Sequence, residues 1–449
     1  MTSMEVRVQL LSGRSAVLEA SPDEAVASVA GRAAEALRVG KGRLLTAEGE
    51  PLDRAAPLKR VRLTGPLTLQ LRLPVVKAGL RHFAVLEGDG TVARSDDEGG
   101  TQASVVALQC TAEAWAALLE DGSVVTWGDA AYGGDKDWAE PELRDVIEIH
   151  STHGAFAALM RDGSLSAWGH HEFGGGTPLE YGGDDFVTGV SCIQANGSAF
   201  VAILRDGSAR AWGDRDCGGW AFDNDLTNVV KIQANRWAFC AIKHDGSVEP
   251  WGHLDFGGFI AGRAPTGVRD VAASTRAFAA ILGDGSVQAW GDEGGGGYLP
   301  VVVSDCREIA ATHYAFAALL GNGSVVTWGE PANGGDSSGV SEKLVRVRCI
   351  QSTARAFAAL LDNGSVVTWG DPEFGGQKED LRGVVAIQAT ISAFAALLED
   401  GGVVSWGFDR EGGDSSGVRG QLHGVAALSA TRRGFVAIRN DGAVVAWGA

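Results

Sequence analysis

The segment AFAALMRDGSLSAWG, at residues 155–169, carries the pattern that most of the chain repeats. Two apolar runs flank an Asp-Gly pair, which is typical of a tight turn between antiparallel strands. We therefore expect a hairpin in which Asp162 and Gly163 form a two-residue turn. Upstream of each such hairpin lies a further short strand, for instance at residues 384–388. Both hairpin strands are apolar on both faces, so the sheet must be covered on two sides.

This pattern occurs ten times. Its Asp-Gly or Asn-Gly turns begin at Asp89, Asp121, Asp162, Asp206, Asp245, Asp284, Asn322, Asn363, Asp400 and Asp441. After a first step of 32 residues, the spacing runs from 37 to 44 residues. Periods of this size indicate a propeller or a solenoid. Three short strands bury too little apolar surface to be stable alone, so neighbouring units must stack.

Aromatic residues hold fixed positions in the units. Six residues before each turn stand Phe83, Trp115, Phe156, Phe200, Phe239, Phe278, Phe316, Phe357, Phe394 and Phe435. Six residues after nine of the turns stand Trp127, Trp168, Trp212, Trp251, Trp290, Trp328, Trp369, Trp406 and Trp447, each followed by Gly; the first unit has Ser95 instead. A functional site is rarely copied nine times, so we interpret these indoles as packing residues. Each contributes at most about 5 kcal/mol when ~200 Å² is buried.

Residues 1–73 have a different pattern. Alternating polar and apolar residues predict strands at 4–11, 15–20, 43–46 and 67–73. Ser21-Pro22-Asp23-Glu24 predicts the start of a helix, with Ser21 as its N-cap. The order strand, strand, helix, strand, strand predicts a small α+β domain of the β-grasp type.

This stretch resembles ubiquitin, through Leu11-Ser12-Gly13, Pro22, Arg43-Leu44-Leu45 and Leu69-Gln70-Leu71-Arg72-Leu73. The resemblance implies a fused ubiquitin-like domain at 1–73 and not a modifier, because Pro74 follows Leu73 where ubiquitin has its diglycine. Leu11 and Leu45 match two positions of ubiquitin's apolar partner-binding patch, whereas the third position is the polar Gln70. Docking to ubiquitin receptors and a merely capping or solubilising role both remain open.

Residues 75–449 resemble the regulator-of-chromosome-condensation repeat family, through the pattern Leu/Ile-x-x-Asp-Gly-x-Val-x-x-Trp-Gly seen at 118–128. The resemblance implies that residues 74–449 form a β-propeller. The family usually closes seven blades and this chain has ten units, so a wider ring and an open spiral both remain open. We expect a mainly β fold, in which a small α+β β-grasp domain precedes a propeller-like array of about ten three-stranded repeats.

Charge and composition argue against some classes of function. The net charge is −18; residues 1–73 carry 11 Lys/Arg against 8 Asp/Glu, and the remainder carries 27 against 48, a net −21. Such an acidic body disfavours nucleic-acid binding. No leader peptide and no apolar run of about 18 residues is apparent, so we expect no membrane association. The six cysteines form no C-x-x-C pair, which favours a reducing, cytoplasmic or nuclear location.

Few residues have the type and spacing of a catalytic, metal-binding or partner-binding site. Asp135, Asp336 and Asp414 each follow a Gly-Gly pair and are candidate partner-binding residues together with Leu11 and Leu45. No D-x-D-x-D-G series supports calcium binding. His150 and His153 lack a third ligand with metal spacing. No G-x-S-x-G motif occurs, and the Gly run at 294–297 lacks the Lys-Ser/Thr of a P-loop. We expect no catalytic, cofactor-binding or metal-binding residues.

These observations predict a non-enzymatic scaffold or adaptor that binds proteins, with a possible link to the ubiquitin pathway. The resemblance leaves two alternatives, because the repeat family includes exchange factors for small GTPases and ubiquitin ligases that carry these repeats. The chain could be a guanine-nucleotide exchange factor, or the non-catalytic substrate-recognition part of a ligase. The sequence identifies neither the partner nor the face that binds it.

Overall fold

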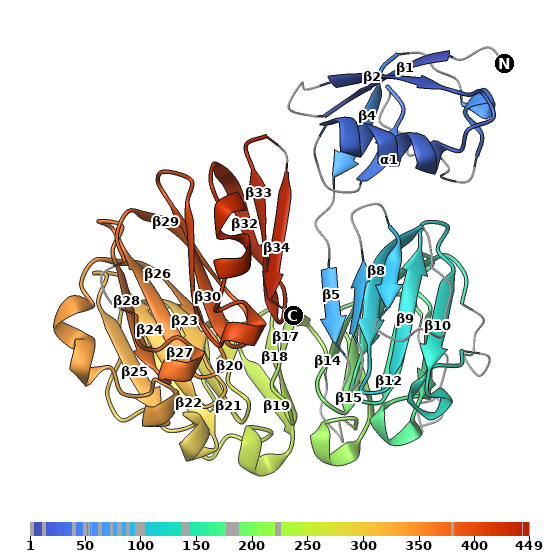
Figure 1. Cartoon of the computed structure of the whole chain (residues 1–449). Helices are drawn as coiled ribbons and strands as arrows, with labels where there is room; N and C mark the ends of the chain where they lie inside the picture. Colours follow the sequence, from blue (N-terminus) through green and yellow to red (C-terminus); the bar gives the residue numbers. More distant parts are fainter. Residues whose placement is uncertain are drawn as a thin grey trace.

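The computed structural model describes residues 4–10, 15–37, 42–47, 52, 54, 56–61, 65–71, 75–78, 83–86, 90–94, 104–136, 143–176, 188–220, 226–378, 381–441 and 443–448. Figure 1 shows a small N-terminal unit set above a curved array of three-stranded sheets. The sequence prediction of a mainly β fold with ten three-stranded repeats is confirmed.

The N-terminal unit is a mixed four-stranded sheet covered by one helix. Its elements are β1 (Met4–Gln9), β2 (Ser15–Ala20), α1 (Val26–Leu37), β3 (Gly42–Leu45), the 3-10 helix η1 (Leu58–Arg60) and β4 (Leu67–Leu71). The sheet order is β2-β1-β4-β3, with β1 and β4 parallel. Apolar residues at helical spacing, Val26, Val29, Ala33 and Leu37, are buried against the sheet. The predicted order of elements is therefore confirmed, while the boundary at 73/74 lies outside the described residues.

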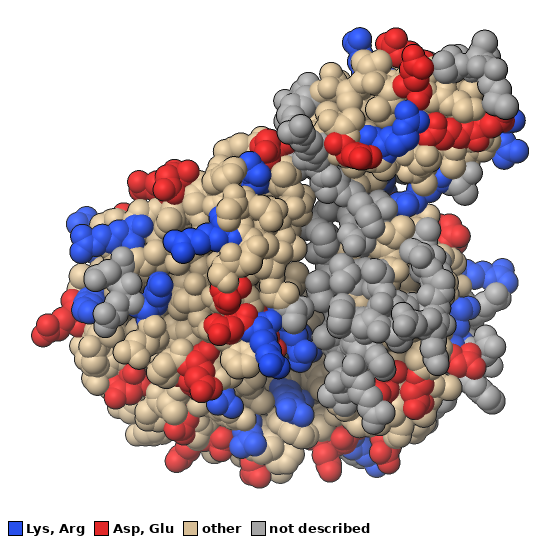
Figure 2. Space-filling model, in the orientation of Figure 1, with Lys and Arg blue, Asp and Glu red and all other residues tan. Residues whose placement is uncertain are grey.

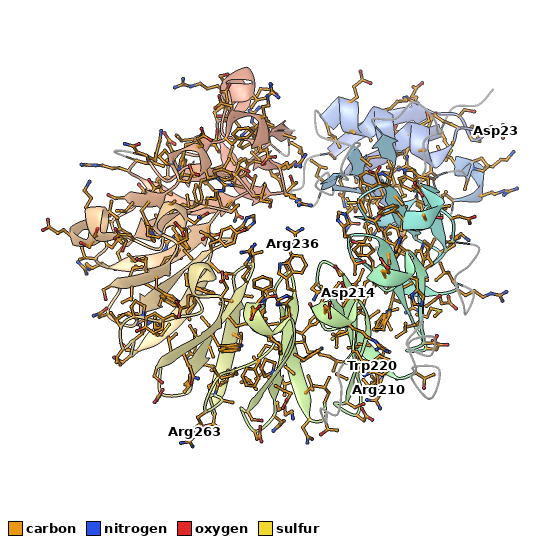
Figure 3. The ribbon with its side chains drawn as sticks, turned by 90° about the horizontal axis from the view of Figure 1, so that it is seen from below. Asp23, Arg210, Asp214, Trp220, Arg236 and Arg263 are labelled. Carbon is orange, nitrogen blue, oxygen red and sulfur yellow. The ribbon has the colours of Figure 1, made fainter. Side chains whose placement is uncertain are left out.

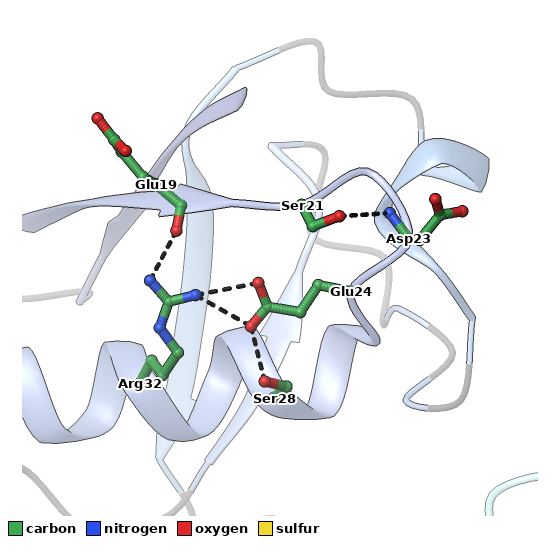
Figure 4. A network of polar contacts seen from close by, with 6 residues as sticks. All are labelled: Glu19, Ser21, Asp23, Glu24, Ser28 and Arg32. Atoms are coloured by element: carbon green, nitrogen blue, oxygen red, sulfur yellow. Dashed lines mark hydrogen bonds and ion pairs between the residues drawn. The ribbon is translucent and has the colours of Figure 1, made fainter. Parts of the chain in front are cut away.

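The predicted start of the helix is wrong by several residues. Residues 22–24 form a turn and α1 begins at Val26, so Ser21 is not its N-cap. The Glu24 carboxylate instead accepts hydrogen bonds from Ser28 Oγ (2.6 Å) and from Arg32 (3.0 Å), as Figure 4 shows. The hydrogen bond from Ser28, with help from Arg32, lowers the pKa of Glu24. Arg32 also donates to the Glu19 carbonyl, which ties α1 to β2.

Each three-stranded sheet of the array is called a blade here. Blades 1 to 5 consist of β5 (Val75–Ala78), β6 (Phe83–Leu86) and β7 (Val92–Arg94); β8 (Val105–Cys110), β9 (Ala114–Leu119) and β10 (Val124–Gly128); β11 (Val146–Ser151), β12 (Ala155–Met160) and β13 (Leu165–Gly169); β14 (Val190–Ala195), β15 (Ala199–Leu204) and β16 (Ala209–Gly213); β17 (Val229–Ala234), β18 (Ala238–Lys243) and β19 (Val248–Gly252).

Blades 6 to 10 consist of β20 (Val268–Ala273), β21 (Ala277–Leu282) and β22 (Val287–Gly291); β23 (Cys306–Ala311), β24 (Ala315–Leu320) and β25 (Val325–Gly329); β26 (Val347–Ser352), β27 (Ala356–Leu361) and β28 (Val366–Gly370); β29 (Val384–Ala389), β30 (Ala393–Leu398) and β31 (Val403–Gly407); β32 (Val425–Ala430), β33 (Gly434–Arg439) and β34 (Val444–Gly448).

Short 3-10 helices follow the third strands. They are η2 (Ala130–Tyr132), η3 (His171–Phe173), η4 (Arg215–Cys217), η5 (Leu254–Phe256), η6 (Glu293–Gly295), η7 (Pro331–Asn333), η8 (Ser338–Lys343), η9 (Pro372–Phe374), η10 (Asp409–Glu411) and η11 (Ser416–Gln421). None of the helices in the described ranges is long and apolar enough to cross a membrane.

The Asp-Gly turn is longer than predicted. In blade 3 the Gly163 N–H donates to the Met160 carbonyl and the Met160 N–H donates to the Ser164 carbonyl, so three residues form the loop. Gly163 adopts φ +88°, the left-handed conformation that follows a turn of this type. Asp162 accepts from the Ser164 N–H (2.8 Å) and its hydroxyl, and these bonds lower the pKa of Asp162. The predicted two-residue turn is therefore wrong. Gly is still needed at this position, because its backbone is left-handed.

Adjacent blades are joined through the fixed aromatic residues. Phe156 and Trp168 stack across the hairpin of blade 3, with ring centroids 5.4 Å apart. They pack with Ala114, Ala116 and Leu118 of blade 2 in one buried cluster. The small Ala side chains let neighbouring sheets approach closely, and the two rings fill the space between them. Among the repeated aromatic side chains that the structure describes, all are buried except Trp127, which is half-buried, and this supports their interpretation as packing residues.

The first strands of consecutive blades lie next to one another along the inside of the array, as the contacts of β11 with β14 and of β14 with β17 show. The blades curl around a common centre, seen end-on in Figure 3. The N-terminal unit is joined to blade 2 by an ion pair between Arg43 Nη1 and Glu120 Oε1 (2.7 Å).

Candidate functional site

At one end of the array, the turns between the first and second strands share a fixed geometry. In blade 3 the Thr152 hydroxyl accepts from the Ala155 N–H (3.1 Å) and donates to the Phe173 carbonyl (2.9 Å), which closes the turn and fastens η3 to it. Equivalent positions in blades 2 to 10 are Thr111, Thr152, Asn196, Asn235, Ser274, Thr312, Thr353, Thr390 and Thr431. Ser, Thr and Asn suit this role because their side chains bond to nearby backbone groups.

The residue after most of these polar residues links one blade to the next. The His153 N–H donates to the Gly197 carbonyl (2.9 Å), and the His313 N–H donates to the Ala354 carbonyl (2.8 Å). The series of donor and acceptor positions is Ala112 to His153, His153 to Gly197, Arg236 to Thr275, Thr275 to His313, His313 to Ala354, Ala354 to Ile391 and Ile391 to Arg432. These turns, here called the inner turns, are therefore linked through the backbone in two runs, from blade 2 to blade 4 and from blade 5 to blade 10.

The inner turns enclose a single cavity of about 1120 Å³. Its lining comes from blades 2 to 10, from Cys110 at one end of the chain order to Arg433 at the other. A volume of this size exceeds that of an ordinary small-molecule pocket. The cavity can therefore receive a chain segment.

The lining is positively charged. It includes Arg236, Arg432 and Arg433 against the single carboxylate Asp214, a formal balance of 3 − 1 = +2. Arg236 and Arg432 are exposed, and Figure 3 shows Arg236 projecting into the centre of the curved array. Asp214 is engaged in capping η4, where its side chain accepts from the Asp216 N–H (2.9 Å).

The pKa of His313 is affected by the positive charges around this cavity. Partial burial lowers its pKa from 6.5, and the nearby charges of Arg355, Arg236 and Arg432 lower it further. These three arginines belong to blades 8, 5 and 10, so the inner turns bring together cations that are far apart in the sequence. Arg355 pairs with Asp371 (3.5 Å) and Arg433 pairs with Glu411 (3.3 Å). Within the described ranges, neither Arg236 nor Arg432 forms an ion pair.

The aspartates singled out in the sequence lie elsewhere. Asp135, Asp336 and Asp414 follow β10, β25 and β31, in three separate blades. Asp336 accepts from the Ser338 N–H (2.8 Å), and Asp414 accepts from the N–H (2.8 Å) and hydroxyl (3.0 Å) of Ser416. These bonds lower the pKa of both carboxyls and show that they organise the loops before η8 and η11. Binding of a partner at the three aspartates stays a prediction.

The apolar positions of the N-terminal unit are only partly described, because Leu11 lies outside the described residues. Leu45 is half-buried on β3, two residues from Arg43 and on the same face of the sheet. Arg43 Nε donates to Gln70 Oε1 (2.7 Å), and Arg43 Nη1 forms the ion pair with Glu120 of blade 2. The face that carries Leu45 and Gln70 is thus close to the array.

Burial raises the pKa of five of the six cysteine thiols, which makes these five poor nucleophiles. All six are free, and burial raises the pKa of Cys217 to about 12 and that of Cys306 to about 11. Cys240, in β18, is fully buried and its pKa is raised as well. In the part of the chain that the structure describes, no group of three or more His, Cys, Asp or Glu side chains could hold a metal ion.

The sequence analysis missed the cavity residues. Arg236, His313 and Arg432 occupy the position after the fixed Ser, Thr or Asn, where the nine blades have Ala, His, Gly, Arg, Thr, His, Ala, Ile and Arg. The next position varies as well, from Gly and Ser to Trp, Tyr and Arg, so variation at these two positions was a usable signal. At both positions residues line the cavity, for example Arg432 and Arg433 in blade 10.

No protein-family model matches the chain, and no curated protein matches it. Solved structures do match. Prp20p of Saccharomyces cerevisiae is 16% identical over 55% of this chain and 76% of that chain, with a TM-score of 0.32. Human WBSCR16 is 14% identical over 65% and 86%, also with a TM-score of 0.32. The ectodomain of the Arabidopsis thaliana receptor kinase ACR4 is 16% identical over 68% and 97%, with a TM-score of 0.31. The neighbours thus include β-propeller repeat proteins of the regulator-of-chromosome-condensation type.

Proposed function

We propose that this protein is a non-enzymatic scaffold that binds other proteins through the cavity of the inner turns. The observation that carries the proposal is the convergence of turns from nine blades on one cavity of about 1120 Å³. Repetition explains this convergence, because any residue placed in the turn of one blade meets its counterparts in the others. Repeat arrays of this kind present extended binding surfaces assembled from many units.

The distribution of roles within each unit supports this proposal. The fixed Phe, Trp, Gly and Ala positions are used for contacts between blades, and the fixed Ser, Thr or Asn closes the turn. What varies is the residue that faces the cavity. A rigid frame with variable side chains at one end is the usual arrangement of a binding protein.

For the N-terminal unit we propose a ubiquitin-like tethering role. The mixed sheet and its helix suit such a domain, and Leu45 supplies part of an apolar patch. The Arg43–Glu120 ion pair holds this unit against blade 2. A receptor that docks on the Leu45 face would therefore have to displace or accommodate that contact.

The test uses the full chain and a plugged cavity. Thr275 lines the cavity in blade 6, so Thr275→Trp fills part of it, whereas Val302→Trp adds the same indole at a side chain that is 98% exposed and outside the lining. Affinity capture from cell extract should retain a defined set of proteins with the wild type and with Val302→Trp. We expect Thr275→Trp to retain these proteins with an affinity at least about tenfold lower, which corresponds to a loss of about 1.4 kcal/mol in binding free energy.

Capture of no protein above background, or equal capture by both variants, would refute the proposal. The exchange-factor alternative predicts a different result in the same proteins, which is accelerated release of labelled guanine nucleotide from a panel of small GTPases. A ligase-subunit role predicts ubiquitin transfer only when a second, catalytic chain is added.

A further inference from the structure

The positive charge of the cavity contrasts with the rest of the array. Residues 74–449 carry 27 Lys/Arg and 48 Asp/Glu, yet the lining holds three arginines and one aspartate. Figure 2 shows acidic and basic side chains intermingled over one outer side of the array. The cavity is therefore a local site of opposite sign and not part of a general basic surface.

Two of the four arginines at the cavity are not neutralised by a carboxylate that the structure describes. Arg433 and Arg355 have carboxylate partners on η10 and at the N-cap of η9. Arg236 and Arg432 form no ion pair with any residue that the structure describes; the Arg236 guanidinium lies 5.3 Å from the Trp237 ring. Two exposed, unpaired guanidinium groups beside His313 are suited to bind carboxylate or phosphate, because each can form paired hydrogen bonds with such an anion.

Building on the proposed function, we propose that the inner-turn cavity binds an acidic segment of a partner protein, and that Arg236 and Arg432 contact its carboxylate or phosphoryl groups. The ligand is thus a short stretch of polypeptide with clustered negative charges. His313 lies between these two arginines in blade order and adds a hydrogen-bonding group to the same wall.

The dimensions and charge favour a peptide segment over other anions. A cavity of about 1120 Å³ is too large for a single inorganic anion to fill. A long nucleic acid would extend over the acidic surface outside the cavity and be repelled there. A short segment avoids that repulsion, because charges are screened beyond about 8 Å at physiological ionic strength.

The experiment uses the full chain and a labelled probe. A short fluorescein-labelled peptide rich in Glu, the same peptide phosphorylated at an added Ser, and a Gln counterpart would be titrated with the protein by fluorescence anisotropy. The cavity variant is Arg236→Gln with Arg432→Gln. The matched control is Arg210→Gln with Arg263→Gln, which changes the charge equally at two exposed residues that Figure 3 places on the outside of the curved array.

We expect the Glu or phosphorylated peptide to bind, the Gln peptide to bind at least about tenfold more weakly, and binding to weaken as salt is raised. The cavity variant should lose at least about tenfold in affinity and the control less than about threefold. The relative affinities of the Glu and phosphorylated peptides identify which anion the arginines prefer. Thermal melts of both variants check that the fold is retained.

Three results would overturn the inference: no binding of either acidic peptide, equal loss in both variants, or tighter binding of a single-stranded oligonucleotide or of inorganic tripolyphosphate. These outcomes are separable from failure of the proposed function. If Thr275→Trp abolishes partner capture while Arg236→Gln/Arg432→Gln binds peptide normally, the scaffold role stands and only the acidic ligand is wrong.

Discussion

The indole Nε1 of Trp168 donates a 3.1 Å hydrogen bond to the carbonyl oxygen of Gly133, which belongs to the segment that leaves the preceding blade. The same bond recurs from blade 3 to blade 10, at 2.9 to 3.2 Å, and its donor and acceptor pairs are Trp168–Gly133, Trp212–Gly174, Trp251–Gly218, Trp290–Gly257, Trp328–Gly296, Trp369–Gly334, Trp406–Gly375 and Trp447–Gly412. The Trp-Gly and Gly-Gly motifs are therefore the two halves of one contact between blades.

Removal of one indole should destabilise the array. Trp328 is 2% exposed and donates to Gly296 at 2.9 Å. Trp328→Phe removes the donor, leaves the buried Gly296 carbonyl unpaired and opens a small cavity. We expect the free energy of unfolding to fall by about 2–4 kcal/mol, measured by urea denaturation.

The control for that variant is Trp220→Phe. Trp220 is half-buried and stacks with Arg215, 4.4 Å from its centroid, so it lies outside the repeated contact. Its replacement should cost less than about 1 kcal/mol. An equal fall in the free energy of unfolding in both variants would show that the hydrogen bond between blades does not stabilise the array.

The clearest sequence patterns predicted the structure well, because in this chain the same residues repeat for the same local reason. Trp168, for example, must fit a slot formed by the previous blade, and so must every equivalent Trp. The start of α1 was predicted wrongly because residues 22–24 form a separate turn, in which the Glu24 N–H donates to the Ser21 carbonyl, and the Glu24 carboxylate reaches forward to Ser28 and Arg32 of the helix. Variation in the turns could have marked these positions, but the cavity itself could not be predicted, because its residues come from separate blades and are placed together only by the curvature of the array.

The first Gly of each Gly-Gly pair should tolerate no side chain. Gly296 has φ +91°, and a Cβ atom there would lie 2.6 Å from Cδ2 of Phe316 in the next blade. Gly262 has φ +103° but open space around its Cβ position. Both Gly→Ala variants thus carry a comparable backbone cost of about 1–2 kcal/mol, and Gly296→Ala adds the clash.

We expect Gly296→Ala to lower the free energy of unfolding by at least about 2 kcal/mol more than Gly262→Ala does. Denaturation of the two proteins under identical conditions measures the difference. Similar costs would mean that Phe316 can move away and that the blades are less tightly packed than the structure shows.

Arg346 offers a stabilising substitution. It precedes β26 with φ +56°, a conformation that blades 6 and 9 adopt with Gly267 and Gly383. Its ion pair with Asp362 is long, at 3.8 Å, and the Arg side chain is 82% exposed, so the pair contributes little. Arg346→Gly should raise the free energy of unfolding by about 0.5–1 kcal/mol, seen as a small increase in melting temperature.

The reciprocal variant provides the check. Gly267 has φ +67° and no atom within 4 Å of its Cβ position, so Gly267→Ala introduces only the backbone cost. It should lower stability by about 1 kcal/mol. Opposite signs for Arg346→Gly and Gly267→Ala are the expected result, and the same sign in both would contradict the assignment of strain to Arg346.

The contact between the N-terminal unit and blade 2 should depend on charge. Arg43 and Glu120 are partly exposed, with 20% and 32% of their side chains accessible, so the pair contributes about 0.5–1 kcal/mol to docking. Glu120→Lys should increase the motion of the N-terminal unit, measured as a broader distance distribution between spin labels on the two units. The double variant Arg43→Glu/Glu120→Lys should restore the wild-type distribution, which a merely local disturbance by either substitution would not do.

Binding of an acidic peptide in the cavity should be coupled to protonation of His313. Burial and the charges of Arg355, Arg236 and Arg432 lower its pKa from 6.5, so the folded protein binds fewer protons here than the unfolded chain does. The stability associated with neutral His313 is accordingly full above pH 6.5 and is lost as the pH falls below it. A bound anion opposes the arginine charges and raises the pKa again, so binding takes up a proton and tightens as the pH falls.

His153 lines the same cavity, so His153→Gln is measured beside His313→Gln. The Glu side chains of the peptide stay ionised down to about pH 5. Affinity for the Glu-rich peptide should therefore rise by up to about tenfold between about pH 8 and pH 6 in the wild type, and change by less than about twofold in His313→Gln. An equal pH dependence in both proteins would place the proton on another group and remove His313 from the site.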